Sequence, residues 1–309
     1  MKFLTLYNKN HISKYTGIKY VYLLLLILII PITISCSNST DSPQNNNASK
    51  LRMTFAVTDI SVGKNRIAFA ILDPNKGVIT PESLDVSTYY LDGEIPNTKI
   101  ETLETTFREW PNGKGVYTTN ANFAESGRWG IGINLFYNNE PHKISASIIV
   151  TEKPKTPPIN SQAPIADTKT ISSLQKISEI TSDPTPHIPL YNISLKDSLE
   201  SKTPTIILFA APAFCQTGTC GPQLDIIKNL SLKWNGDFNF IHSEIYSNLN
   251  ELDGDISNAK ISKAATAWNL PSEPWTFVID SSGKIVSKFE GFTTEEELEE
   301  SIKSILDSE

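Results

Sequence analysis

The sequence predicts two folded domains of different class, an all-β domain followed by an α/β domain, behind an N-terminal export segment. The 309-residue chain opens with a basic and then apolar stretch within residues 1–35. Short β-branched runs between turn signals fill residues 51–152, and strand-like and helical runs alternate over residues 188–309. The roughly 270 residues beyond the export segment suit two domains rather than one.

The N-terminal segment is predicted to be a signal peptide. Residues 1–19 carry four lysines and no acidic residue, and residues 21–30 are apolar apart from Tyr22. This apolar stretch is shorter than the ~20 residues that span a membrane comfortably, which is typical of a signal peptide rather than of a transmembrane helix.

The end of the apolar stretch resembles the cleavage site of a bacterial lipoprotein signal. The small residue Ser35 precedes Cys36 as that processing requires, whereas Thr33 stands where leucine is more usual. The resemblance implies that residues 1–35 are removed and that Cys36 is lipidated. An uncleaved anchor and simple secretion are the alternatives.

The segment after Cys36 and the overall charge fit an exported, tethered protein. Residues 36–50 are rich in Ser, Asn and Asp, which predicts a flexible tether. Removal of residues 1–35 takes away four lysines and no acid, leaving 23 basic and 34 acidic residues and a net charge of about −11. This balance argues against nucleic-acid binding. The expected location is the extracytoplasmic face of a bacterial membrane, with the lipid as the contact to the membrane.

The first domain, residues 51–152, is predicted to be an antiparallel β-sandwich of immunoglobulin-like type. Its runs are short and β-branched or alternating, and Pro, Asn, Asp and Gly residues separate them. No catalytic constellation occurs in it, and Trp129 is interpreted as a core aromatic residue. The predicted strands are 53–60, 66–72, 84–90, 115–119, 129–136 and 144–150.

A proline-rich linker and lead-in, residues 153–187, separates the two domains. Four prolines within residues 153–164 indicate a semi-rigid segment of polyproline character. The pattern beyond it predicts an α/β domain with the order βαβαββα. The expected strands are 205–209, 238–246, 275–279 and 284–289, with a short strand at 187–191; the expected helices are 194–200, 222–234, 259–268 and 294–306.

Two cysteines follow the buried strand 205–209 and are the leading candidates for a redox centre. Gly221 and Pro222 open the next helix, so Cys220 lies at a helix N-terminus, where the helix dipole stabilises a thiolate. Cys215 and Cys220 are five positions apart, too far for a disulfide within a continuous helix. Gly218 permits a loop that brings the two sulfurs together.

These residues resemble the thioredoxin superfamily over roughly residues 188–306. The resemblance is carried by the cysteine pair at a helix start, by Pro274 just before a strand, by the hairpin 280–284, by Gly291 and by the acidic terminal helix. It implies a cis peptide bond between Glu273 and Pro274 beside the cysteine pair, where the neighbouring backbone receives the substrate chain. An ordinary trans turn is the alternative.

The sequence departs from this family in two respects. The family has two residues between its cysteines and this chain has four, so two alignments are possible. In the first, Cys215 is the attacking thiol. In the second, residues 220–223 match the family's Cys-Gly-Pro-Cys motif, and Gln223 replaces its second cysteine. The family's buried acid falls on Phe209. His242 and Glu244 alternate on the next strand and could approach the pair, although buried structural roles are favoured for both.

Three functions compete. The leading one is a membrane-tethered thiol–disulfide oxidoreductase that acts on envelope proteins, with Cys215 as nucleophile and Cys220 as resolving thiol. The second is a non-enzymatic interaction or assembly module with a structural disulfide. The third, a peroxiredoxin-like peroxidase, lacks a suitable threonine because Pro212 takes its place, and the last arginine of the chain is Arg128. Neither a cofactor nor a metal ion is expected, and oligomeric state is not predicted.

Overall fold

The computed structural model describes residues 50–110, 113–171, 176–215 and 217–307. These residues belong to one compact unit that spans Ala48–Glu309. The predicted signal peptide, nearly all of the tether and the predicted lipidation site Cys36 lie outside the described residues. No helix within the described ranges is both long and apolar enough to span a membrane.

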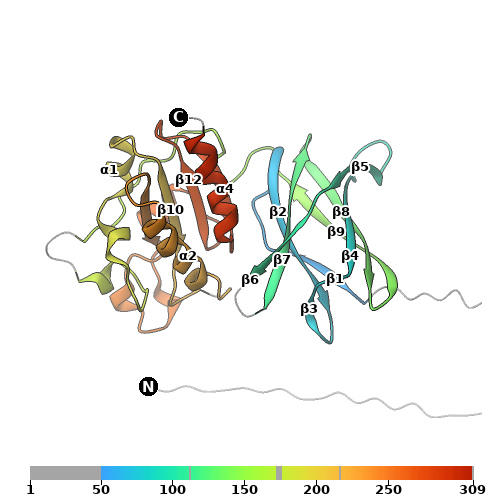
Figure 1. Cartoon of the computed structure of the whole chain (residues 1–309), viewed down its shortest axis with the longest axis horizontal. Helices are drawn as coiled ribbons and strands as arrows, with labels where there is room; N and C mark the ends of the chain where they lie inside the picture. Colours follow the sequence, from blue (N-terminus) through green and yellow to red (C-terminus); the bar gives the residue numbers. More distant parts are fainter. Residues whose placement is uncertain (1–49, 111–112, 172–175, 216, 308–309) are drawn as a thin grey trace, which may run out of the picture. The chain divides into compact units, whose positions relative to one another are not determined.

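Residues 51–151, here called the β-lobe, form two antiparallel sheets (Figure 1). The first sheet has the order β1-β2-β7-β6 with β3 paired to β2, and the second has the order β5-β4-β8-β9. The strands are β1 (Arg52–Phe55), β2 (Gly63–Asp73), β3 (Gly77–Ile79), β4 (Ser83–Tyr90), β5 (Thr98–Leu103), β6 (Thr106–Trp110), β7 (Lys114–Phe123), β8 (Gly127–Tyr137) and β9 (Glu140–Val150).

The core of the β-lobe lies between its two sheets. On β8 the alternating residues Trp129, Ile131 and Ile133 are each no more than 2% exposed, because every second side chain of a strand points to the same face. The ring of Trp129 packs against Phe123, and its indole N–H donates to the backbone oxygen of Glu125 over 3.0 Å. The prediction that Trp129 is a core residue is confirmed.

The strand pattern missed three short strands and overextended one. The strands β3, β5 and β6 were not predicted; β5 exposes most of its side chains and shows no apolar alternation. The predicted strand 53–60 ends at Phe55. Beyond that point the backbone N–H groups of Thr58 and Asp59 donate to the carboxylate of Glu290 instead of to a neighbouring strand, over 2.6 and 3.2 Å.

The proline-rich segment forms backbone hydrogen bonds to the hairpin turn at residues 283–285. The backbone N–H of Asn160 donates to Ile285, and that of Ala163 donates to Gly283, over 2.7 and 2.9 Å. Ala163 and Ala166 are buried in a hydrophobic core that they share with Phe277 and Ile285. The short 3-10 helix η1 (Ile177–Glu179) follows.

Residues 188–307, here called the α/β-lobe, surround a four-stranded sheet with the order β11-β10-β12-β13. Strand β11 runs parallel to β10, whereas β12 is antiparallel to β10 and β13 is antiparallel to β12. The strands are β10 (Thr205–Ala210), β11 (Asn239–Glu244), β12 (Trp275–Ile279) and β13 (Ile285–Glu290); the helices are α1 (Leu195–Glu200), α2 (Cys220–Lys233), α3 (Lys263–Ala267) and α4 (Glu295–Leu306), with 3-10 turns η2 (Ile188–Tyr191), η3 (Leu249–Glu251) and η4 (Ile256–Asn258).

Both faces of this sheet are covered, so its central strand is buried on both sides. Ile206 and Leu208 of β10 share a core with α2 and α4, which lie together on one face (Figure 1). Ile207 and Phe209 share the opposite core with α1 and α3. This explains why residues 205–209 form a continuous apolar run rather than an alternating one.

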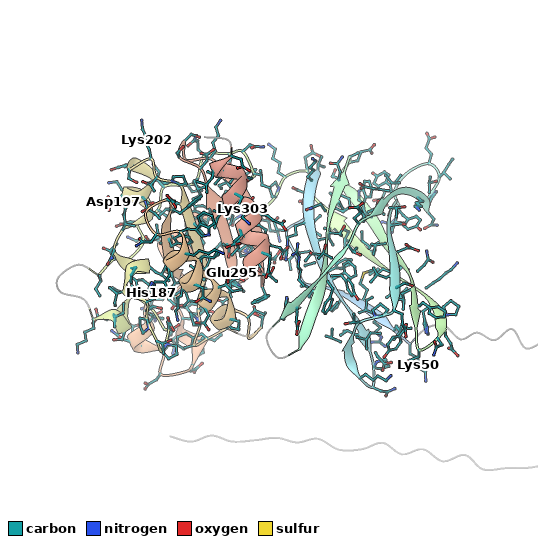
Figure 2. All side chains as sticks on the ribbon, in the orientation of Figure 1. Lys50, His187, Asp197, Lys202, Glu295 and Lys303 are labelled. Carbon is teal, nitrogen blue, oxygen red and sulfur yellow. A yellow bond between two sulfur atoms is a disulfide. The ribbon has the colours of Figure 1, made fainter. Side chains whose placement is uncertain are left out.

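The α/β-lobe confirms most predicted elements and corrects two. Residues 187–191, predicted as a strand, contain η2, which starts after His187 (Figure 2) and has Pro189 in its first turn. The predicted helix 259–268 is shortened to α3, because Ile261 pairs with Tyr246 in an extended bridge and Ser262 caps the helix through the backbone N–H of Ala265.

Candidate functional site

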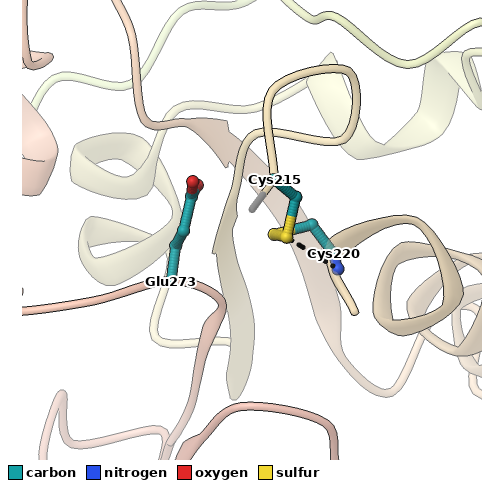
Figure 3. A group of neighbouring side chains, drawn as sticks. All are labelled: Cys215, Cys220 and Glu273. Atoms are coloured by element: carbon teal, nitrogen blue, oxygen red, sulfur yellow. Dashed lines mark hydrogen bonds between the residues drawn. A yellow bond between two sulfur atoms is a disulfide. The ribbon is translucent and has the colours of Figure 1, made fainter. Parts of the chain in front are cut away.

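The cysteine pair lies between the end of β10 and the start of α2, and it forms a disulfide (Figure 3). The Cα atoms of Cys215 and Cys220 are 5.9 Å apart, within the usual range for a disulfide. Gly218 has a φ of +69°, a left-handed conformation that favours glycine. The predicted pairing and the predicted loop at Gly218 are confirmed, and α2 begins at Cys220 itself.

The two sulfur-bearing residues differ in exposure and in their hydrogen bonds. Cys215 is half-buried and Cys220 is 0% exposed. The backbone N–H of Cys220 donates to Sγ of Cys215 over 3.2 Å, and the hydroxyl of Thr217 lies 3.2 Å from the same sulfur. The first amide of α2 is therefore directed at Cys215. The sequence predicted that the helix N-terminus stabilises a thiolate at Cys220. In the structure the first N–H of the helix donates to Sγ of Cys215, so the stabilised thiolate is that of Cys215.

Glu273 and Pro274 form the loop that faces the cysteine pair. Their peptide bond is cis, as the resemblance implied, and Pro274 is buried at the start of β12. A carboxylate oxygen of Glu273 and the two cysteine sulfurs all lie within 4.8 Å of one another. Figure 3 shows Glu273 on one side of the disulfide and the backbone nitrogen of Cys220 on the other. The structure thus brings together the four predicted site residues that it describes, Cys215, Cys220, Glu273 and Pro274.

The carboxyl group of Glu273 is unusual in its surroundings. Burial raises its pKa to about 7, although a hydrogen bond from the backbone N–H of Ala211 acts in the opposite direction. Its Oε2 atom is buried and has no hydrogen-bond partner within the described part of the chain. A half-buried carboxyl with one buried, unpaired oxygen beside a disulfide was not predicted, because the direction of this side chain depends on the fold.

A second buried acid, Glu244, lies at the end of β11. Its Oε2 atom accepts hydrogen bonds from the backbone N–H and the hydroxyl of Ser182, each over 2.8 Å. The hydroxyl oxygen of Ser182 in turn accepts from the backbone N–H of Ala213, close to the cysteine loop. Burial raises the pKa of Glu244 to about 7, and the charge of Glu273 adds to the increase. Glu244 therefore supports the loop before Cys215 through Ser182.

His242 is a buried structural residue, as the sequence favoured. Its ring is 1% exposed; Nε2 lies 3.1 Å from the backbone oxygen of Ala210, and Nδ1 lies 2.8 Å from the hydroxyl of Tyr191. Burial lowers the pKa of His242 to about 4, so the ring is neutral at pH 7. A neutral ring that donates from Nε2 to Ala210 accepts from Tyr191 at Nδ1.

Phe209 and Gln223 stand at the positions where the sequence departs from the thioredoxin pattern. Phe209 is 0% exposed and packs against Trp268 and Phe277, so the strand before the cysteines offers no proton acceptor there. Gln223 is buried in the first turn of α2, and its side-chain oxygen accepts from the backbone N–H of Thr293 over 2.7 Å. Gln223 therefore joins α2 to the loop before α4.

A cavity of about 480 Å³ adjoins the cysteine loop. Ala213 and Phe214, which immediately precede Cys215, line one part of it. Its remaining wall is largely formed by Thr181, Ser182, Asp183, Pro184, Pro186 and Leu249. The two residues that immediately precede Cys215 in the chain therefore line a hollow in the surface.

No family model matches the sequence, and neither does any curated protein. Among solved structures, the chain is similar to a putative thiol:disulfide interchange protein DsbE from Chlorobium tepidum, with 17% identity and a TM-score of 0.30 over 37% of this chain and 86% of that one. It is also similar to a thiol-disulfide oxidoreductase from Bacteroides fragilis, with 16% identity and a TM-score of 0.27 over 36% of this chain and 88% of that one.

A third similar structure is the Lin-41 filamin domain, with 14% identity and a TM-score of 0.22 over 34% of this chain and 96% of that one. Each of these similarities covers 34–37% of this chain. At these identities and scores, the chemistry of the site rests on the residues of this chain.

Proposed function

We propose that this protein is an extracytoplasmic thiol–disulfide oxidoreductase that acts through Cys215 and Cys220. The observation that carries the proposal is the asymmetry of the pair, in which Cys215 is partly accessible and receives a helix N-terminal hydrogen bond while Cys220 is fully buried. An attacking thiol must be reachable and stabilised as a thiolate, whereas a resolving thiol only has to reach its partner.

Starting from the oxidised pair, a substrate thiolate attacks Sγ of Cys215. The bond between the two cysteines breaks, its electron pair goes to Sγ of Cys220, and a mixed disulfide joins the substrate to Cys215. A second substrate thiolate then attacks the substrate sulfur of that mixed disulfide and releases the thiolate of Cys215. In total the substrate dithiol loses two electrons and two protons, and the cysteine pair gains them. The same steps in reverse reduce a substrate disulfide.

The substrate is proposed to be an envelope protein with thiols or a disulfide. The cis Glu273–Pro274 loop beside the sulfurs supports this, since in the resembling family this backbone receives an extended chain. The cavity next to Phe214 and the prolines Pro184 and Pro186 adds an apolar surface for a polypeptide. Attachment to the extracytoplasmic face of the membrane through a lipid on Cys36 completes the proposal, and its support is the sequence of residues 1–36.

The reduction potential of the pair tests this function. We expect about −120 to −270 mV, the range of catalytic pairs, for the full chain carrying Cys36→Ala, which leaves Cys215 and Cys220 as the only cysteines. The chain is equilibrated with glutathione or dithiothreitol buffers, and free thiols are counted by alkylation and mass. A potential well below about −300 mV is typical of a structural disulfide. That result would favour the interaction or assembly module instead.

A further inference from the structure

We propose that the carboxyl group of Glu273 exchanges a proton with the sulfur of Cys220 during disulfide exchange. The inference rests on the proposed function and extends it by naming the proton carrier of the buried cysteine. Nothing in the sequence pattern assigns such a role, because the strand position where the resembling family has its buried acid holds Phe209.

The geometry places Glu273 within reach of the leaving sulfur. One of its carboxylate oxygens lies within 4.8 Å of both sulfurs, and it approaches from the loop before β12 rather than from α2 (Figure 3). Oε2 of Glu273 makes no hydrogen bond to either sulfur. Catalytic hydrogen bonds are often long in a resting state and shorten, or pass through one water, once the reaction begins.

The two oxygens of Glu273 are in different situations. The backbone N–H of Ala211 hydrogen-bonds to the carboxylate and fixes its position. Oε2 is buried and has no hydrogen-bond partner among the described residues. An unsatisfied buried oxygen is costly, which favours the uptake of a proton by this carboxyl group.

Burial prepares this carboxyl for both directions of proton transfer. It raises the pKa of Glu273 to about 7, so protonated and ionised forms are present in similar amounts near neutral pH. A group of this kind donates to the thiolate that leaves when the disulfide opens, and accepts from the thiol that attacks when it closes. The titratable groups found to interact with Glu273 are Glu244 and Tyr246, both from the region at the end of β11.

Two other buried groups near the site are His242 and Glu244. Both ring nitrogens of His242 have partners, in Ala210 and Tyr191. Oε2 of Glu244 is held by two hydrogen bonds from Ser182, and its Oε1 atom is buried without a hydrogen-bond partner among the described residues, so proximity to the sulfurs is what distinguishes Glu273. Glu273 is the carboxylate that lies within 4.8 Å of both sulfurs in the part of the chain that the structure describes.

The proton and electron balance follows from this placement. When a thiolate attacks Sγ of Cys215, the electron pair of the broken S–S bond goes to Sγ of Cys220, and the Glu273 carboxylic acid gives that sulfur its proton. The carboxylate recovers a proton from water. In the closing direction, Glu273 takes the thiol proton of Cys220, the resulting thiolate attacks Sγ of Cys215, and the substrate leaves as a thiolate.

The test is the pH dependence of disulfide reduction in the full chain with Cys36→Ala. The second-order rate constant with dithiothreitol is measured from pH 5 to pH 9 and divided by the thiolate fraction of the reductant. We expect this corrected rate to be constant at low pH and to fall about 10²-fold as pH rises through about 7, because only the protonated carboxyl can donate. A flat profile in this wild-type site overturns the proposal without any substitution in the site.

Glu273→Gln identifies the group responsible for the fall. The amide keeps an acceptor for Ala211 but cannot titrate, so the corrected rate should be flat and about 10²-fold below the wild type at pH 5. Glu244→Gln is the matched control, a second buried acid with a raised pKa, and it should retain a fall with pH. Persistence of the same fall in Glu273→Gln would contradict the proposal.

The two proposals fail in distinguishable ways. If Glu273→Gln leaves the corrected rate unchanged while the reduction potential stays in the catalytic range, only the assignment of Glu273 as proton carrier is wrong. A potential well below about −300 mV removes the exchange function itself.

Discussion

As the pH falls from 7 to 4, protonation of His242 should lower the stability of the folded chain, whereas Glu244 and Glu273, whose pKa values are raised to about 7, act in the opposite direction. The ring is 1% exposed and burial lowers its pKa from 6.5 to about 4. In the unfolded chain the ring binds a proton below about pH 6.5, whereas the folded site binds one only near pH 4. A base with a depressed folded pKa contributes stability that is present above the unfolded pKa and is lost as pH falls below it.

The size of this loss follows from the shift. A difference of about 2.5 pKa units, at about 1.36 kcal/mol each, gives a limit of about 3.4 kcal/mol. At pH 4 the folded ring is itself half protonated, so the loss between pH 7 and pH 4 is about 3 kcal/mol. The ring also holds the backbone oxygen of Ala210, the last residue of β10 before the cysteine loop. Because Nε2 donates to Ala210, the added proton goes to Nδ1, which can then no longer accept the hydrogen bond from Tyr191.

The assay is equilibrium unfolding in denaturant at pH 7, 6, 5 and 4 for the wild type and His242→Gln. Gln can donate to Ala210 but does not titrate, so between pH 7 and pH 4 the wild type should lose about 3 kcal/mol of unfolding free energy relative to this variant. His142→Gln, which alters a partly exposed ring on β9, is the control and should follow the wild type. Equal pH dependence in the wild type and His242→Gln, or an NMR titration of His242 near pH 6.5 in the folded state, would refute the reasoning.

Two further predictions concern the cysteines. Cys220→Ser should accumulate mixed disulfides with envelope proteins in a non-reducing gel, because the accessible Cys215 attacks and no resolving thiol remains, whereas Cys215→Ser should accumulate few; trapping by Cys215→Ser alone would reverse the roles. Cys36→Ala should leave the membrane fraction or remain unprocessed, while the wild type partitions into detergent; identical mass and fractionation of the two forms would rule out lipidation.

Local signals were sufficient for the elements that position the site. Strand β12 matches its predicted bounds at Trp275–Ile279, because five consecutive buried side chains leave little ambiguity. Helix α4 begins after Thr294, which caps it together with Glu297. The disulfide was predictable because Cys215 has only Cys220 as a partner once Cys36 is assigned to the lipid, and the positive φ of Gly218 follows from the spacing.

Elements with weak local signals were missed. Strands β5 and β6 are largely exposed or half-exposed, so they lack the apolar alternation from which strands are predicted. The end of β1 at Phe55 depends on Glu290, a residue far along the chain whose carboxylate takes the N–H groups of Thr58 and Asp59. Such a competition for backbone donors is invisible in a short sequence window.

The sequence by itself determined which chemistry is available: two thiols at a strand-to-helix turn and a proline before the next strand. Only the tertiary structure decided how that chemistry is distributed. It left Cys215 partly exposed and buried Cys220, directed the first amide of α2 at Cys215, and placed the carboxyl of Glu273 within 4.8 Å of the sulfurs. The physical reason is that burial and proximity depend on residues distant in sequence, and these two quantities set the proton affinity and the reactivity of each group.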